Sequence, residues 1–215
     1  MKDYNQALAY EIFIKEEYGF AKEQIRTAKV IFDIGGHIGL FSQWCLQLNP
    51  QAQIFFFEPF AQHMEQAKKR LQAYAQQVQF FPYAVGEQEG SQIFLFCSQK
   101  SMQSGKFRSF LNPTGQEQEI QVKKLNPYLE NPEIARIDVL KLDIEGMEFE
   151  VLKSLSELAW AKVESLICEV HLLSPELEQQ WKVLKRALQA RFQVMEWKVS
   201  PYTEKIGLCF CQKNP

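Results

Sequence analysis

Hydrophobic residues recur along the chain in two patterns. Short apolar runs, rich in β-branched and aromatic residues and bounded by glycine, proline or polar residues, predict buried strands. Longer stretches with apolar residues at helical spacing, such as Met64, Ala67 and Leu71, predict amphipathic helices. The predicted strands are 30–34, 53–57, 78–85, 93–97, 120–125, 138–143, 165–170, 192–199 and 206–211. The predicted helices are 38–48, 61–75, 148–158 and 175–191.

Alternating strands and helices predict an α/β fold, in which a mainly parallel sheet carries helices on both faces. The last two predicted strands are joined by only residues 200–205, too few for a parallel crossover, so we expect an antiparallel hairpin there. Residues 98–115 are polar, contain glycine and proline and show no period, which predicts a mobile loop. No boundary divides the 215 residues, so we expect a single domain over 1–215.

Composition narrows the class of partner. The chain has 24 Lys and Arg against 26 Asp and Glu, a net charge of -2, whereas a dedicated nucleic-acid-binding domain usually carries a basic excess. The first residues contain no apolar signal region, and no apolar run approaches the roughly 18 residues of a membrane helix. With an odd number of cysteines, five, we expect a cytoplasmic protein with reduced thiols and without membrane or nucleic-acid partners.

A glycine-rich turn, Asp33-Ile34-Gly35-Gly36-His37-Ile38-Gly39, follows the first predicted strand. Ligands of open α/β sheets bind beyond the carboxyl ends of the strands, where glycines let the backbone approach them. The spacing D-x-G-x-x-x-G lacks the last glycine of the dinucleotide pattern, and no lysine follows as in a P-loop. A pyrophosphate is therefore not the expected ligand. His37 is expected to fix the turn or to form a shelf for a cofactor.

A second acid supports a nucleoside ligand. Glu58 ends the strand 53–57, about twenty residues after the turn, where a carboxylate can accept both ribose hydroxyls. An ordinary acid at a strand end is the alternative. Because S-adenosylmethionine has a ribose, an amino group and a sulfonium but no phosphate, the pattern suits it better than NAD.

The chain resembles the FkbM-type S-adenosylmethionine-dependent methyltransferases. The resemblance spans about residues 28–212, and its most specific part is the run Leu140-Lys141-Leu142-Asp143-Ile144-Glu145-Gly146-Met147-Glu148. The other matching segments, in chain order, are Phe32-Asp33-Ile34-Gly35-Gly36-His37-Ile38-Gly39-Leu40-Phe41-Ser42, Phe57-Glu58-Pro59, Tyr83-Ala84-Val85-Gly86 and, more weakly, Glu169-Val170-His171. The resemblance implies the class I methyltransferase (Rossmann-like) fold, a seven-stranded, mostly parallel sheet with an antiparallel last strand.

By resemblance, the cofactor's methionine part lies against Asp33, Gly35 and Gly39, its ribose against Glu58, and its adenine near Ala84 and Val85. The predicted cofactor site as a whole consists of Asp33, Gly35, Gly36, His37, Gly39, Glu58, Pro59, Ala84, Val85 and Asp143. Almost all of the chain belongs to the methyltransferase core. The acceptor site is therefore expected to come from an N-terminal extension at 1–29 and the loop at 98–115, where Ser104-Gly105-Lys106-Phe107-Arg108-Ser109 matches the family only loosely.

Methyl transfer to a hydroxyl needs alignment of the acceptor and a base for its proton. His171 is the favoured base because an unperturbed histidine titrates near neutral pH; a structural pair with a carboxylate is the alternative. Asp143 would orient the acceptor or the cofactor amine, and Lys141 shares its face of the strand, so the two can form an ion pair. Glu145 and Glu148 either join this chemistry or cap the next helix. The predicted catalytic residues are His171, Asp143 and Glu145.

Asp143, Glu169 and His171 are also of types that bind divalent metals, but we predict a metal-free site. His63, on a predicted helix, is expected at the surface. The sequence thus predicts an O-methyltransferase that acts on a hydroxyl of a small molecule, a sugar or secondary metabolite, and yields S-adenosylhomocysteine. It is expected to be a monomer or homodimer. The alternatives are an RNA methyltransferase on the same fold and a non-catalytic cofactor-binding module.

Overall fold

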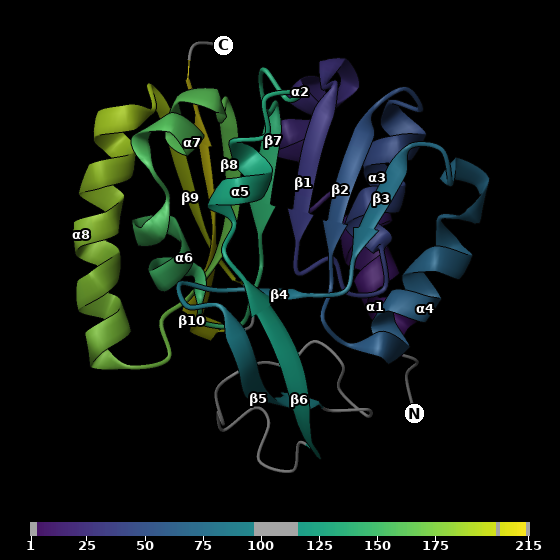
Figure 1. The fold of residues 1–215 in the computed structure, drawn as a ribbon. Helices are drawn as coiled ribbons and strands as arrows, with labels where there is room; N and C mark the ends of the chain where they lie inside the picture. Colours follow the sequence, from purple (N-terminus) through teal and green to yellow (C-terminus); the bar gives the residue numbers. More distant parts are fainter. Residues whose placement is uncertain (1–3, 97–115, 201–202, 214–215) are drawn as a thin grey trace.

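A seven-stranded sheet forms the centre of the computed structural model, which describes residues 4–96, 116–200 and 203–213. Its strands run in the order β3-β2-β1-β7-β8-β10-β9; β10 is antiparallel to both β8 and β9, and the other neighbouring pairs are parallel (Figure 1). The strands are β1 Val30–Ile34, β2 Gln53–Phe57, β3 Val78–Phe81, β7 Val139–Leu142, β8 Ser165–His171, β9 Val194–Ser200 and β10 Thr203–Gln212. The expected fold and the antiparallel hairpin at its end are confirmed.

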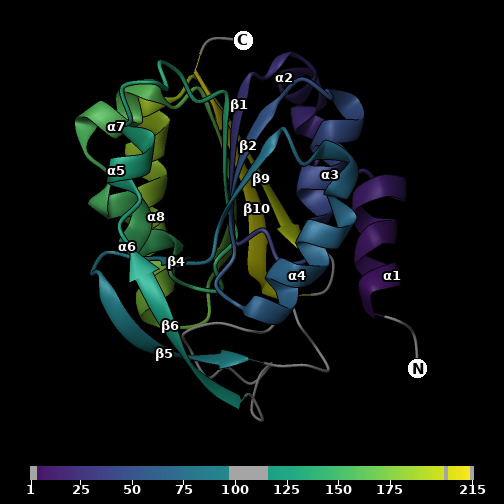
Figure 2. The same cartoon turned by 45° about the vertical axis from the view of Figure 1, so that its right-hand side comes forward.

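Helices cover both faces of this sheet (Figure 2). One face packs against α1 Tyr4–Ala9, α2 Lys22–Thr27, α3 Leu40–Leu48 and α4 Ala61–Arg70. The other face packs against α5 Asn126–Leu129, α6 Glu148–Ser154, α7 Glu157–Lys162 and α8 Pro175–Arg191. Strands buried on both faces explain why β1, β2 and β7 read as nearly continuous apolar runs rather than alternating ones. Among the helices of the described residues, none is both long and apolar enough to cross a bilayer.

A second, three-stranded sheet extends from the carboxyl edge of the first (Figure 1). It consists of β4 Ala84–Val85, β6 Gln116–Lys123 and β5 Gly90–Phe96, in that order. The prediction of one strand over 78–85 is therefore wrong. Pro82 lacks the N–H that a continued ladder would need, so β3 ends before it and β4 starts afresh in the other sheet. The predicted loop at 98–115 lies outside the described residues.

Two predicted helices are also interrupted. The helix at 148–158 breaks at Leu155, whose ψ of 130° is extended, and α7 restarts behind Ser156, whose Oγ accepts the Ala159 N–H at 3.0 Å. This is an ordinary N-cap, which apolar spacing alone does not reveal. The helix at 61–75 ends as α-helix at Arg70 and continues only as a 3₁₀ turn, Gln72–Tyr74.

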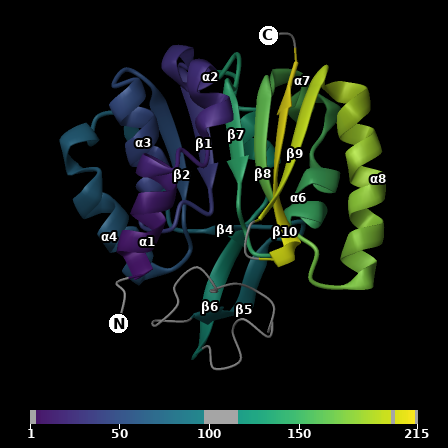
Figure 3. The same ribbon diagram turned by 180° about the vertical axis from the view of Figure 1, so that it is seen from behind.

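The N-terminal residues pack on the α3 face of the core, as seen from behind in Figure 3. After α1 come a π-helical turn, Tyr10–Ile14, and a 3₁₀ turn, Gly19–Ala21. The buried Tyr18 ring packs edge-on against Phe41 of α3, with 4.9 Å between centroids. These contacts bring the segment to the carboxyl end of the sheet.

Candidate active site

A cavity of about 690 Å³ lies at the carboxyl ends of β1, β2, β7 and β8. Its polar wall comes from the segments that directly follow these strands, including Gly35–His37 and Glu58–Phe60. Ala84 and Val85 of β4 give it an apolar wall, together with Phe94 of β5. From the N-terminal segment, the lining residues are Ala7, Leu8, Glu11, Ile12, Glu17 and Tyr18.

The glycine turn is tied to both neighbouring strands. The N–H groups of Gly35 and Gly36 donate to the Phe57 carbonyl at 3.0 and 2.9 Å. Gly35 has a φ of 75°, and a Cβ built on it would lie 1.8 Å from the carbonyl oxygen of Asp143. Any side chain there would force β1 and β7 apart, so the close approach of the two strand ends requires glycine.

Behind this turn lies a buried ion pair. Lys141 Nζ lies 3.3 Å from Asp33 Oδ1 and 3.6 Å from Asp143 Oδ2, and it donates to the Gly35 carbonyl at 2.8 Å. The ion pair that the shared strand face allows between Lys141 and Asp143 is thus present. Burial alone would lower the pKa of Lys141, but the two carboxylates outweigh it and raise that pKa, so the ammonium stays charged.

Two residues predicted to hold the cofactor do not line the cavity. Asp33 is fully buried and turns its carboxylate away, accepting the Ser42 hydroxyl at 2.6 Å. Gly39 has a φ of 81° and lies under α4, where a Cβ would come within 3.2 Å of Ala67. Both act on the turn from behind: Asp33 positions Lys141, and Gly39 lets α3 begin close to α4.

Glu58 holds the next segment of the wall. Its Oε2 accepts the His37 N–H at 3.0 Å and its Oε1 accepts the Phe60 N–H at 2.9 Å. His63 Nδ1 lies 3.2 Å from the same Oε1. A carboxylate oxygen has room for a second donor, so these bonds leave capacity toward the cavity.

His63 is buried, so its prediction as a surface residue is wrong. It precedes Ala67 by one helical turn and therefore continues the apolar stripe of α4, a signal present in the sequence. Its ring lies 4.3 Å from that of His37, and both residues line the cavity. In the described structure the buried Nε2 atom of each has no hydrogen-bond partner. Burial, reinforced by His63, lowers the pKa of His37 to about 3, so this imidazole is neutral.

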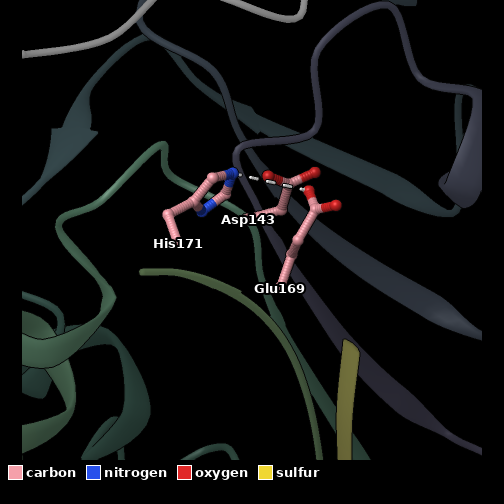
Figure 4. Close-up of side chains that lie close together, drawn as sticks. All are labelled: Asp143, Glu169 and His171. Atoms are coloured by element: carbon pink, nitrogen blue, oxygen red, sulfur yellow. Dashed lines mark ion pairs between the residues drawn. The ribbon is translucent and has the colours of Figure 1, made fainter. Parts of the chain in front are cut away.

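The opposite wall carries a cluster of two carboxylates and an imidazole, Asp143, Glu169 and His171 (Figure 4). One potential metal-ligand atom from each side chain lies within 4.8 Å of the other two. They converge because β7 and β8 are parallel neighbours, with Leu142 beside Cys168, so both strands end at this edge. His171 Nε2 lies 3.8 Å from Glu169 Oε2 and 3.6 Å from Glu145 Oε2.

Glu148 orients the imidazole of His171. This fully buried carboxylate accepts the N–H groups of Ile144 and Gly146, each at 3.1 Å, and lies 3.0 Å from His171 Nδ1. It therefore fixes the turn before α6, close to the capping role expected for it. With Nδ1 bound to Glu148, Nε2 faces the cavity.

The surroundings of His171 and Glu145 favour the protonated form of both side chains. Burial would lower the pKa of His171, but Glu148 and the acids near Nε2 raise it well above the ordinary value. Burial raises the pKa of Glu145 to about 8, against the opposing effect of His171. A general base must be neutral before it accepts a proton, so His171 can act as a base only after it has given up its own.

The sequence indicated most of the polar wall and a contribution from residues 1–29, but not which N-terminal residues line the cavity. Residues 4–18 show no motif, and their place over the cavity follows from the packing of Tyr18 on α3. Glu17 lines the cavity in this way, and burial raises the pKa of its carboxyl. The expected contribution of 98–115 lies outside the described residues.

The strand order, with antiparallel β10 between β8 and β9, and the cavity at the carboxyl edge define the class I methyltransferase fold. The chain belongs to the FkbM methyltransferase family, whose domain matches residues 33–195. It is therefore a methyltransferase of FkbM type.

Relatives of this family are distant. The chain is 27% identical to the AMB antimetabolite synthetase AmbE of Pseudomonas aeruginosa over 75% of its own length, but spans only 9% of that much longer protein. It is 23% identical to the 31-O-demethyl-FK506 methyltransferase FkbM of Streptomyces tacrolimicus, over 77% of the chain and 74% of the relative. A crystal structure of the O-methyltransferase TomG from Streptomyces achromogenes, in complex with S-adenosylmethionine, superposes with a TM-score of 0.57 at 13% identity, covering 100% of this chain and 92% of that one. The likeness to TomG concerns the fold.

Proposed function

We propose that the protein transfers a methyl group from S-adenosylmethionine to a hydroxyl of a small molecule. The observation that carries this proposal is the position of the Asp143, Glu169 and His171 cluster, in the same cavity as the glycine turn and Glu58. One wall thus suits a nucleoside and the other can receive a proton. The O-methyltransferases among the relatives and structural neighbours, 31-O-demethyl-FK506 methyltransferase and TomG, support the choice of a hydroxyl.

The chain's own donors and acceptors fit this cofactor. Glu58 suits the ribose hydroxyls, and the unpartnered Nε2 atoms of His37 and His63 are buried polar atoms that a ligand's polar groups would satisfy. Ala84 and Val85 offer an apolar surface to an adenine ring. In this proposal Gly35, Gly36 and His37 border the methionine part, Pro59 lies beside the ribose, and Asp143 faces the amine.

When bound, S-adenosylmethionine supplies a methyl carbon that bonds to the acceptor oxygen as its bond to sulfur breaks and the electron pair stays on sulfur. The residues of the chain align the acceptor with that carbon and exclude water. The hydroxyl proton passes to the polar wall formed by Asp143, Glu145 and His171 and from there to water. Glu11 and Glu17 add acids to the same cavity, which favours a neutral or cationic small acceptor over a polyanion such as RNA.

Glu58→Gln tests the cofactor half of the proposal. The amide keeps the shape and one oxygen but removes a charged acceptor, and hydrogen bonds to charged groups contribute about 1.5–3 kcal/mol. We expect calorimetry to show S-adenosylmethionine binding to the native protein and binding weakened about 10- to 100-fold in the variant. Glu65→Gln, at an exposed acid of α4, the helix that follows Glu58, is the matched control and should bind like the native chain.

Failure of the native protein to bind S-adenosylmethionine, or equal binding by Glu58→Gln, would contradict the cofactor assignment. Circular dichroism of both variants ensures that the comparison is made between folded proteins. The acceptor half is tested with methyl-labelled cofactor and a panel of hydroxylated and amine-bearing small molecules, in which label should appear in an ether and not in an N-methyl product.

A further inference from the structure

We propose that Asp143, Glu169 and His171 bind a divalent transition-metal ion that activates the acceptor hydroxyl, an inference whose functional half rests on the proposed methyl transfer. The three side chains present two carboxylate oxygens and an imidazole nitrogen within 4.8 Å of one another (Figure 4). Carboxylate and imidazole ligands together suit a first-row transition-metal ion better than Ca²⁺ or Mg²⁺, which prefer oxygen alone.

The imidazole is held as metal-binding histidines usually are. A ligating histidine almost always donates its other ring nitrogen to a carboxylate or carbonyl, which fixes the ring and its tautomer. Here Glu148, fully buried, lies 3.0 Å from His171 Nδ1, and Nε2 is left toward Glu169. The His171 side chain is 2% exposed, so it cannot swing away to another partner.

The carboxylates, in contrast, remain open toward the cavity. The side chains of Asp143 and Glu169 are 28% and 33% exposed, and both line the cavity together with His171. Three protein ligands on one side would leave the remaining coordination positions to the acceptor, which is the pattern of catalytic rather than structural metal sites.

The excess of acidic over basic side chains around Asp143, Glu169 and His171 also favours a bound cation. The acids at or directly behind it are Asp33, Asp143, Glu145, Glu148 and Glu169, and the basic side chains are Lys141 and His171. With five carboxyl groups against two bases in a largely buried place, ionising all five together costs free energy unless a cation offsets the charge. Lys141 cannot serve alone, because it is shared with Asp33 and already donates to the Gly35 carbonyl.

A divalent ion here would change how the hydroxyl reacts. It would stabilise negative charge on the acceptor oxygen as the O–H bond breaks, with the proton leaving to water, and so present a better nucleophile to the methyl carbon. Adjacent oxygens on one acceptor could occupy two open positions, so vicinal diols and hydroxy-carbonyl compounds are the expected acceptor class.

Mn²⁺ binding tests the inference directly, without any turnover. The native protein, stripped with a chelator, is titrated with Mn²⁺ and the free ion is followed by electron paramagnetic resonance, in the absence of cofactor and acceptor. We expect one saturable site per chain, weakened at least about tenfold by Asp143→Asn and by Glu169→Gln. Glu17→Gln, at an acid in the same cavity but outside the cluster, should stay within about threefold of the native affinity.

Calorimetry with S-adenosylmethionine on the same samples separates the two proposals. If the cofactor binds but no Mn²⁺ site is found, or if Glu17→Gln weakens Mn²⁺ as much as the cluster variants do, the metal inference is overturned and the proposed function stands. If Mn²⁺ binds as expected but the cofactor does not, the metal site is supported and the proposed function fails. Methyl transfer that survives a strong chelator unchanged would also overturn the metal's role.

Discussion

Replacing Lys141 with methionine should lower the free energy of unfolding by about 3–5 kcal/mol, as expected when one partner of a buried ion pair is removed. Methionine fills a similar volume, so the loss comes from charge rather than from a cavity. The carboxylate of Asp33 is fully buried and would keep only the Ser42 hydroxyl, and the Gly35 carbonyl would lose its donor. Urea unfolding, followed by circular dichroism, measures the change.

The double variant Asp33→Asn with Lys141→Met distinguishes charge from packing. Without the Asp33 carboxylate, the fully buried charge is gone and only Asp143, whose side chain is partly exposed, still lacks its partner, so the double variant should regain more than half of the lost stability. A loss below about 1 kcal/mol in Lys141→Met, or a double variant less stable than the single one, would show that the pair is not what holds the turn. S-adenosylmethionine binding should weaken with the single variant, because the Gly35 turn rests on this ammonium.

The fold was readable from the sequence where secondary structure follows local pattern. Strands β1, β2 and β8 and helix α8 lie where apolar runs, glycines and Pro175 predict them. The wrong predictions of strand and helix boundaries occur where a single residue ends one element and starts another. After Pro82, Ala84 and Val85 join the second sheet as β4. Ser156 caps a new helix although the apolar pattern continues without a break.

The positions of the site residues could be predicted from the sequence as far as the order of strands and helices determines them. Parallel strands place Glu58, Asp143 and His171 at one edge, which the alternation of strands and helices already implies. The direction of each side chain is not contained in that pattern. Asp33 lies near the end of a strand beside the cavity, yet its carboxylate turns inward to Lys141.

Replacing Glu148 is expected to give the second large loss of stability. Glu148→Ala should lower the free energy of unfolding by at least about 3 kcal/mol, since buried donors without acceptors cost about 1–3 kcal/mol each. It removes the acceptor of the Ile144 and Gly146 N–H groups and of His171 Nδ1 together. Glu178→Gln, at an exposed acid in the first turn of α8, is the control and should change stability by less than about 0.5 kcal/mol.

Glu148→Gln separates support of the fold from support of the chemistry. The amide keeps one oxygen in the same place, so we expect a smaller loss of stability, about 1–2 kcal/mol, and a folded protein. It no longer offers His171 a charged acceptor, so the imidazole is held less firmly and Mn²⁺ should bind about 10- to 100-fold more weakly. S-adenosylmethionine affinity should change little, because Glu58 and the Gly35 turn do not touch Glu148. Equal losses in Mn²⁺ and cofactor affinity would instead mean that Glu148 only holds the loop in place. Unchanged Mn²⁺ affinity would mean that His171 does not depend on this carboxylate to face the cavity.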